Sequence, residues 1–544
     1  MSDPFLFTSP LARQAARSLH TVEWLSENNT WSSDSYYRWN FWRTRRMMAR
    51  TPDEAAAWLP ALAFALSREE SVSVLAEFAR WPLPEPLPPE ALPWRTALIQ
   101  GWEQYPAATD WETSCRLFAL MRLDRRVERL PEWLREARRA LDLEPEDRRF
   151  RLAALAGWRP RPGDSLPHGD KAEAAQAWVR FWEESYKSPY MEGLIAAAAL
   201  LHLAEAGWLP SGPSPERLRE EFRQRVQEGP VHERSVLQMV MASISADALS
   251  PEQQDIMAWL ELTHENVSWK KREAVWDMLA AWQQERILER SGRGQLAEPS
   301  PLLPALARTL EWEWHTNVLA AMMRYIPEAA EVSTYPKAAR TIVDHLETHS
   351  RNEYQDFCLT AWVARWNLLR AGALTAEEQA RFNVDYADYV ETIGSENELG
   401  LLALAQIIPP GTFPLAAWTG RLSDWNNRCR LTAHLAIHGW LMEVAGGGQH
   451  RQIRQVLRRR GQEGTDAGTV APFVNIPPNV LPDFRRLHEI ETALAAGQIP
   501  PPDAGAGNRP ISRTVPARLP ESRPRKDPPG ITGRMEGPES TLLR

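Results

Sequence analysis

Ala55-Ala-Ala-Trp-Leu-Pro-Ala-Leu-Ala-Phe-Ala-Leu66 (AAAWLPALAFAL) carries the pattern that decides the fold. Its apolar side chains recur at spacings of three and four residues, which is the period of an α-helix. Ser235–Ile244 and Tyr354–Leu369 repeat this pattern, and strict alternation over the length of a strand is scarce. The sequence therefore predicts an all-α protein.

Helix starts and breaks can be located from residue chemistry. The segments Thr51–Glu54, Ser250–Gln253 and Thr375–Glu378 match the capping box, in which a hydroxyl accepts from an orphan amide and a side chain three residues on reaches back. Proline-rich stretches that cannot continue a helix cover residues 82–93, 159–169, 209–215 and 291–304. The helices between them follow no fixed repeat, so we expect an irregular multi-helix array, solenoid-like or bundle-like.

Composition divides the chain into four expected parts. Residues 1–165 are predicted to form an N-terminal helical domain, and residues 166–445 the main helical domain. Residues 446–498 are expected to be a basic helical extension. Residues 499–544 hold 10 prolines, 8 basic and 5 acidic residues with few large apolar groups, so this tail is predicted to be disordered.

Overall totals limit the classes of function. With 544 residues, 43% of them hydrophobic, the chain can bury a large core, and its 25 tryptophans imply thick helix–helix contacts. The formal charge of -8 excludes a uniformly basic protein, so nucleic acid would be held by local patches. Three scattered cysteines (Cys115, Cys358 and Cys429) form no CxxC pair, and no apolar run approaches the length of a membrane span. We expect a cytoplasmic protein that does not insert into the membrane.

Two basic patches are candidate phosphate contacts. The first, Arg38–Arg50, interleaves five arginines with aromatic residues and contains no acid. Guanidinium groups can fork onto phosphates while the tryptophans pack inward or stack on bases. The alternative is an amphipathic helix whose aromatics face the core and whose arginines pair with acids such as Glu54. The arginines assigned to nucleic acid here are Arg43, Arg45, Arg46 and Arg50.

The second patch follows the glycines at 446–448 and has the sequence HRQIRQVLRRR at residues 450–460. Its basic residues recur at helical spacing along one stripe, as expected of an element that tracks phosphates, and the alternative is a solvated terminal helix. The residues assigned to nucleic acid are Arg451, Arg454, Arg458, Arg459 and Arg460. A third group, between Arg122 and Arg139, alternates with acids and is predicted to pair with itself.

Metal and catalytic patterns are weaker. His434 and His438 are four residues apart on one helix face, but the segment HLAIH lacks the glutamate of the zinc-protease HExxH motif. Hydrogen-bonded core histidines are the favoured interpretation. Glu396 or Glu398, about forty residues earlier, can meet one of these histidines inside the core, and we interpret such a pair as structural rather than catalytic. No phosphate-binding loop, nucleophile elbow or dinucleotide fingerprint is present, so we expect neither enzyme activity nor a cofactor or metal.

A long helical chain with this glutamate and histidine spacing and a basic C-terminal end resembles the EH-signature proteins, called ZorC, of the bacterial Zorya antiphage defence system. The resemblance places the signature glutamate on Glu396 or Glu398 and the histidine on His438 or His434. It implies a cytosolic DNA-binding component that acts with a proton-driven membrane motor complex and a helicase–nuclease.

The leading hypothesis is therefore a non-enzymatic, sequence-independent DNA-binding protein of a defence system, with double-stranded DNA as its partner. One alternative is an α-helical scaffold whose tryptophan-lined surface holds a protein partner. The other is a helical metal-dependent hydrolase that uses His434 and His438.

Overall fold

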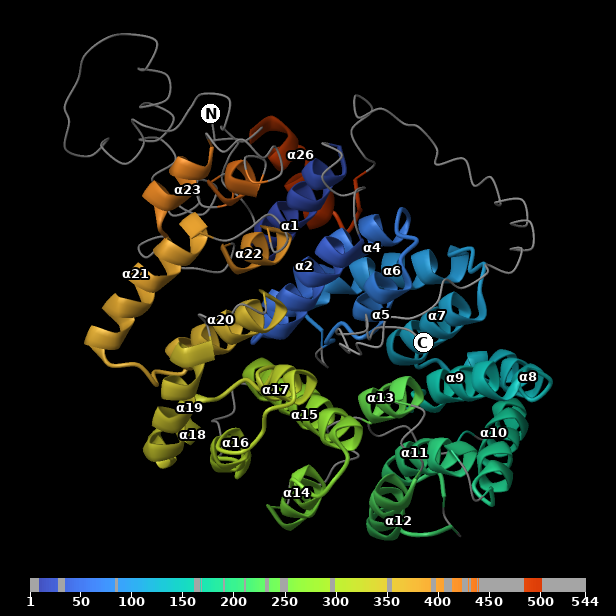
Figure 1. Cartoon of the computed structure of the whole chain (residues 1–544). Helices are drawn as coiled ribbons and strands as arrows, with labels where there is room; N and C mark the ends of the chain where they lie inside the picture. Colours follow the sequence, from blue (N-terminus) through green and yellow to red (C-terminus); the bar gives the residue numbers. More distant parts are fainter. Residues whose placement is uncertain are drawn as a thin grey trace, which may run out of the picture. The chain divides into compact units, whose positions relative to one another are not determined.

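Every regular element among the residues described in this computed structural model is a helix, which confirms the predicted all-α class (Figure 1). The structure describes residues 9–27, 35–83, 87–160, 167, 169–188, 191–209, 212–229, 234–244, 253–293, 299–349, 355–392, 398–405, 413–422, 429, 432–437, 439 and 484–500. By their contacts the residues divide into a unit 1–500 and a unit 501–544. Residues 501–544 of the predicted disordered tail and residues 161–166 of the proline-rich stretch lie outside the described residues.

The helices of the first half of the chain are α1 (Pro10–Glu27), α2 (Ser35–Met48), α3 (Pro52–Ala56), α4 (Leu59–Leu66), α5 (Val72–Ala79), α6 (Leu92–Gln104), α7 (Asp110–Leu123), α8 (Leu130–Ala140), α9 (Pro145–Ala156), α10 (Ala172–Ser185), α11 (Met191–Glu205), α12 (Pro215–Glu228), α13 (Arg234–Ser243) and α14 (Gln253–Leu260). Those of the second half are α15 (Trp269–Arg293), α16 (Leu302–Leu310), α17 (Thr316–Met322), α18 (Ala329–Thr334), α19 (Pro336–His349), α20 (Gln355–Arg370), α21 (Ala376–Thr392), α22 (Glu398–Ala405), α23 (Leu415–Arg421) and α26 (Phe484–Ala495). Short 3-10 helices lie at Pro89–Ala91, Val127–Arg129, Gly169–Lys171 and Glu261–Thr263.

The stretch 55–66 is helical but is interrupted. Helix α3 ends at Ala56, and α4 begins at Leu59 with Pro60 in its first turn. A proline ring clashes with the carbonyl four residues earlier and offers no amide hydrogen, so one continuous helix cannot pass through this position. The prediction that this stretch is helical is confirmed, but Pro60 divides it into two helices where the pattern indicated one.

Capping chemistry locates several helix starts. The Thr375 backbone N–H donates to Glu378 Oε2 at 2.8 Å and the Glu378 N–H donates to Thr375 Oγ1 at 3.3 Å, which confirms that capping box. Thr51 caps α3 by accepting from the Glu54 N–H at 3.1 Å, but the Glu54 carboxylate accepts from the Arg50 N–H instead of completing the box. Ser250 lies outside the described residues.

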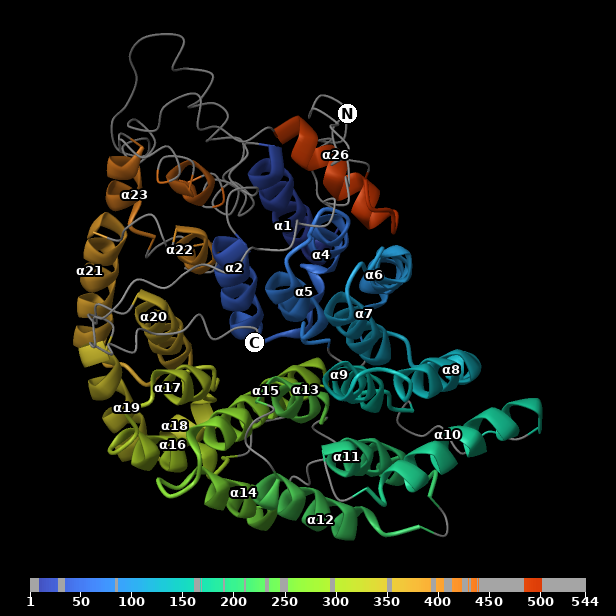
Figure 2. The same ribbon diagram turned by 45° about the vertical axis from the view of Figure 1, so that its right-hand side comes forward.

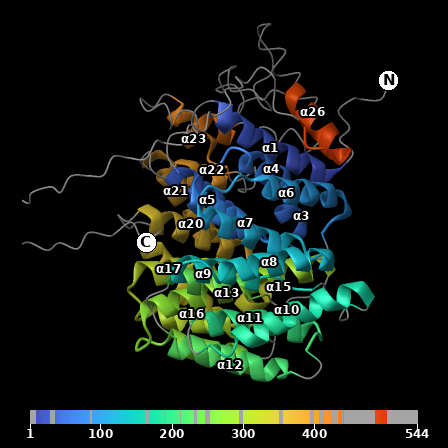
Figure 3. The ribbon, with the colours of Figure 1, turned by 90° about the vertical axis from the view of Figure 1, so that its right-hand side faces the viewer.

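The inner helices follow a closed path of contacts. Helix α2 packs on α5, and the path continues through α7, α9, α13, α15, α17, α20 and α22 before α22 returns to α2. Figures 1 and 2 show these helices succeeding one another around the path. Figure 3 shows α6, α7, α9, α11 and α12 in turn from top to bottom, and each contacts the next. Closure brings residues 35–48 against residues 398–405, which are far apart in sequence.

Tryptophans fill the contacts between these layers, as their number predicts. Trp42 meets Trp58, Phe78 and Trp81 edge to face, with ring centroids between 4.9 and 6.1 Å apart. Such pairs add about 0.5–1.5 kcal/mol each beyond the area that they bury. The hydrophobic core is continuous from Leu11 to Leu494 through the described residues.

Candidate functional site

Several helices of the closed path converge on one small polar cavity of about 50 Å³. Six of its lining side chains are charged, and they come from five separate elements along the path. The charged lining residues are Arg46 on α2, Arg80 at the end of α5, Arg122 on α7, Asp277 and Glu285 on α15, and Arg324 just after α17. Small side chains on the same walls, including Ala242, Ala280 and Ala281, leave the space open.

Three of the four arginines bind carboxylates within the protein. Arg46 Nε donates to Glu77 Oε2 at 2.7 Å. Arg324 forms an ion pair with Asp277. Arg122 donates to Glu285 Oε1 at 3.3 Å and to the Ala79 carbonyl at 3.2 Å. These bonds fix the arginines in the wall of the cavity.

Arg80 differs from the other three. Its backbone N–H donates to the carbonyl oxygens of Ala76 and Phe78 at the end of α5. Its guanidinium, which lines the cavity, donates no hydrogen bond to any residue that the structure describes. Burial lowers the pKa of Arg80, Glu77 opposes that shift, and Arg46 adds to it. A charged group with five donors is therefore held at the cavity without a hydrogen-bonding partner from the described residues.

The surroundings of the cavity carry an excess of positive charge. Burial lowers the pKa of Arg122 to about 10 against the attraction of Glu285, and its neighbours Arg46 and Arg80 lower it further. Burial likewise lowers the pKa of Arg43, behind the wall, to about 9. Burial and like-charged neighbours therefore disfavour the charged forms of Arg80, Arg122 and Arg43, which is a condition in which a bound anion stabilises a site. Arg324 differs, because Asp277 and Glu77 raise its pKa against the effect of burial.

The first basic patch lies inside the protein. Arg43 stacks over the Trp39 ring at 4.6 Å, and Arg45 stacks over Trp58 at 4.4 Å. Arg45 also donates to the Ala403 carbonyl on α22 at 3.2 Å, and the Arg50 guanidinium donates to the backbone carbonyls of Pro327 and, at 3.4 Å, Asn367. Arg43, Arg45 and Arg46 are buried, with exposed fractions of 6%, 7% and 9%. The aromatic residues of α2 face the core, as the alternative interpretation has it, but Arg43 and Arg45 lie against aromatic rings and do not pair with Glu54. Of the four predicted residues only Arg46 lines the cavity.

The other predicted residues are mostly beyond the described part of the chain. Arg451, Arg454, Arg458, Arg459, Arg460, Glu396 and His438 lie outside the described residues. Glu398 begins α22, but its side chain is not described. His434 is partly buried, its ring lies 5.3 Å from that of Trp24, and burial lowers its pKa. The Glu/His pair therefore stays a prediction.

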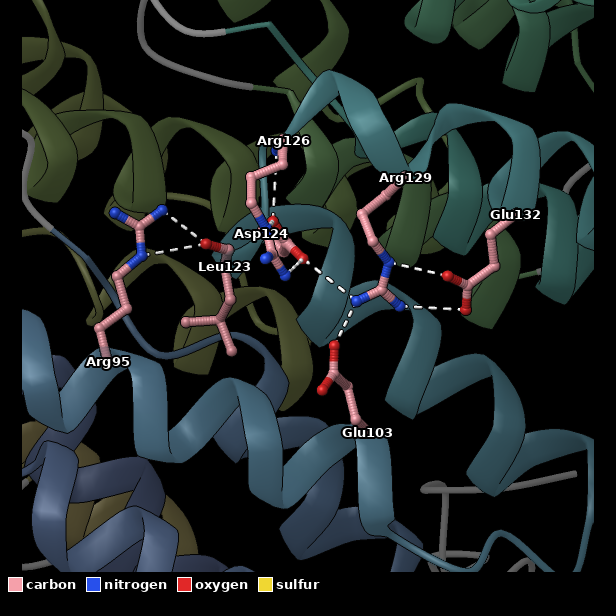
Figure 4. Close-up of polar contacts among 7 residues, drawn as sticks. All are labelled: Arg95, Glu103, Leu123, Asp124, Arg126, Arg129 and Glu132. Atoms are coloured by element: carbon pink, nitrogen blue, oxygen red, sulfur yellow. Dashed lines mark hydrogen bonds and ion pairs between the residues drawn. The ribbon is translucent and has the colours of Figure 1, made fainter. Parts of the chain in front are cut away.

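In the third basic group, Arg126, Arg129 and Arg139 pair with acids of the same group, as predicted, whereas Arg122 does not; Figure 4 shows Arg126 and Arg129. Arg126 donates twice to Asp124 at 2.7 Å, and Arg129 bridges Asp124, Glu103 and Glu132. Arg122 is the exception, because it faces α15 and the cavity. Sequence reasoning missed Arg80, Asp277, Glu285 and Arg324 altogether, since no local pattern sets them apart.

Two further properties of the described residues bear on other classes of site. No group of three histidine, cysteine, aspartate or glutamate side chains within the described ranges is placed to hold a metal ion. Among those same ranges, no helix combines the length and apolar character that crossing a membrane requires. Cys115, Cys358 and Cys429 are free thiols and all three are buried.

Comparison with known proteins identifies no family for this chain. No family model matches the chain, and no curated protein matches it. Among solved structures the chain is similar to an engineered protein, with 13% identity over 78% of this chain and 99% of that chain, at a TM-score of 0.25. A likeness at this level carries no argument about function.

Proposed function

We propose that the protein is a non-enzymatic binding protein that holds DNA through its phosphate groups, without reading base sequence. The observation that supports this proposal most strongly is the cavity lined by four arginines and only two carboxylates, with Arg80 free of hydrogen bonds to the described residues. Guanidinium donors match phosphate oxygens in geometry and charge. Phosphate contacts position a nucleic acid but carry no sequence information.

The proposal combines two separate elements. The arginines of residues 451–460 are the sequence candidates for tracking the DNA backbone, and the cavity supplies an additional phosphate contact of fixed geometry. Under the resemblance to the EH-signature proteins, this binding would serve an antiphage defence system together with other subunits.

Fluorescence anisotropy with labelled double-stranded DNA of arbitrary sequence tests the proposal. Affinity should fall by orders of magnitude between low and moderate salt, because each neutralised phosphate releases counterions. Replacing Arg451, Arg454, Arg458, Arg459 and Arg460 with glutamate should abolish binding, whereas Arg217→Ala, a change on an exposed face of α12, should not. An affinity that the glutamate variant leaves unchanged would overturn the assignment to this segment, and absence of binding at low salt would overturn the proposal.

A protein partner is the second candidate, and one residue favours it. Trp314 is 79% exposed, whereas most tryptophans of the described residues are buried. It adjoins His315, which stacks on Trp269 with ring centroids 4.0 Å apart. Exposed tryptophans beside fixed aromatic rings are common anchors of protein interfaces.

A further inference from the structure

Size limits what the arginine-lined cavity can hold. A cavity needs a volume of about 10–15 Å³ to hold one water molecule. The volume of about 50 Å³ found here therefore has room for a group of a few heavy atoms. A tetrahedral oxyanion is of that size, and a stretch of nucleotide chain is much larger. The cavity therefore accommodates one phosphate group that projects into it.

The charge of the cavity lining indicates which class of anion it binds. The lining has two more arginines than carboxylates. Adding Arg43 and Glu77, which interact electrostatically with lining residues, leaves that difference unchanged. A phosphate monoester carries about -1.5 to -2 charges at pH 7, whereas a phosphodiester within a strand carries only one. The excess at the cavity is balanced by the monoester.

Free donors are available for such a group. Arg80 makes no hydrogen bond to a described residue, and Arg46 engages Glu77 through its Nε. The Nη groups of Arg46 donate to none of the described side chains or carbonyls. Two guanidinium forks from different helices can thus meet one tetrahedral anion without breaking an existing ion pair.

From this size, charge and donor set we infer that the cavity is a binding site for a terminal phosphate monoester, as found at the 5′ end of a DNA strand or on a mononucleotide. The inference rests on the proposed function for its choice of DNA, but the site itself does not depend on it. Arg80 is the principal ligand, Arg46 and Arg122 complete the cationic wall, and the alanines of α13 and α15 make room for the phosphorus atom and its oxygens.

The test compares a short labelled single strand with a 5′-phosphate against the same strand with a 5′-hydroxyl, using the full chain and fluorescence anisotropy. The phosphorylated strand should bind at least about tenfold more tightly. Arg80→Ala, which removes a donor, and Ala281→Leu, which fills the cavity without changing its charge, should each remove that advantage. Arg217→Ala is the matched control, since it removes one exposed arginine outside the cavity, and it should leave the advantage intact.

Thermal unfolding with inorganic phosphate and with adenosine 5′-monophosphate separates the two sources. Both probes should raise the unfolding midpoint of the wild type and of R217A in a saturable manner, and neither should do so for R80A. If both probes raise the unfolding midpoint in this way while neither DNA strand binds, the site is confirmed for a free monoester and the DNA proposal fails. If both strands bind equally and neither probe shifts the midpoint, DNA binding stands and the inference about the cavity is overturned.

Discussion

Glu331 is a buried carboxyl group whose protonation should govern how stability depends on pH. Its side chain has an exposed fraction of 0%. Oε1 accepts from the Tyr325 hydroxyl at 2.5 Å and Oε2 accepts from the Glu328 N–H at 2.9 Å. Burial raises the pKa of Glu331 from 4.5 to about 7, because lost solvation outweighs these hydrogen bonds.

The size of the effect follows from that pKa. Moving a pKa from 4.5 to about 7 corresponds to about 3 kcal/mol, at about 1.4 kcal/mol for each pH unit. Between these values the folded chain keeps a proton that the unfolded chain has released, so the free energy of unfolding falls as the pH rises. The full penalty applies above about pH 7, and it is absent below about pH 4.5.

Glu331→Gln keeps the shape of the side chain and removes its ionisation. E331Q should therefore resemble the wild type at about pH 4 and exceed it by about 3 kcal/mol at about pH 8. Thermal unfolding followed by circular dichroism across this range measures the difference, and Glu173→Gln on an exposed turn of α10 is the matched control. A difference between E331Q and the wild type that is the same at both ends of the range would refute the reasoning.

Two further variants test the packing. Arg272 donates two hydrogen bonds of 2.7 and 3.0 Å to Glu313, and the two side chains are 7% and 0% exposed. Arg272→Met should therefore lower the free energy of unfolding by about 3–5 kcal/mol, because it leaves a buried carboxylate unpaired. The double variant with Glu313→Leu should recover part of that lost stability. Additive losses in denaturant unfolding would contradict this coupling. A Cβ at Gly193 would collide with the Ser188 carbonyl, so Gly193→Ala should cost about 1–3 kcal/mol of folding stability. Gly420→Ala places its Cβ in open space and should be neutral or stabilising. Equal unfolding midpoints for the two variants would refute the clash.

Helical period predicted the fold class and the helices in residues 55–66, 235–244 and 354–369, since it is a local property. The α2–α22 contact that closes the path could not be predicted this way, because residues 35–48 and 398–405 share no local signal and meet only through the accumulated angles of the helices between them. Burial of α2 had a usable signal. Its sequence contains no acidic residue and many aromatic ones, and every residue from Trp39 to Met48 is buried.

The candidate site shows the same division between local and tertiary information. Arg126 pairs with Asp124, two residues away, and the alternation of charges predicts that contact. Arg122 lies in the same basic group, yet it reaches Glu285 on α15, more than 160 residues later. Which face of α7 meets another helix decides between the two outcomes, and no spacing within the group encodes that face.

Arg80 links the site to stability. Arg80 is partly buried, and its burial and the neighbouring arginines lower its pKa against the attraction of Glu77. Its charged form is therefore less favourable in the folded chain than in the unfolded chain at neutral pH. Arg80→Ala should therefore raise the unfolding midpoint in phosphate-free buffer while it removes ligand binding, a trade-off expected where a site is kept strained for its ligand. Comparing R80A with R217A by thermal unfolding decides the point. A lower midpoint for R80A alone would show that Arg80 stabilises the wall in the absence of ligand, and would remove the reason to regard its free donors as reserved for an anion.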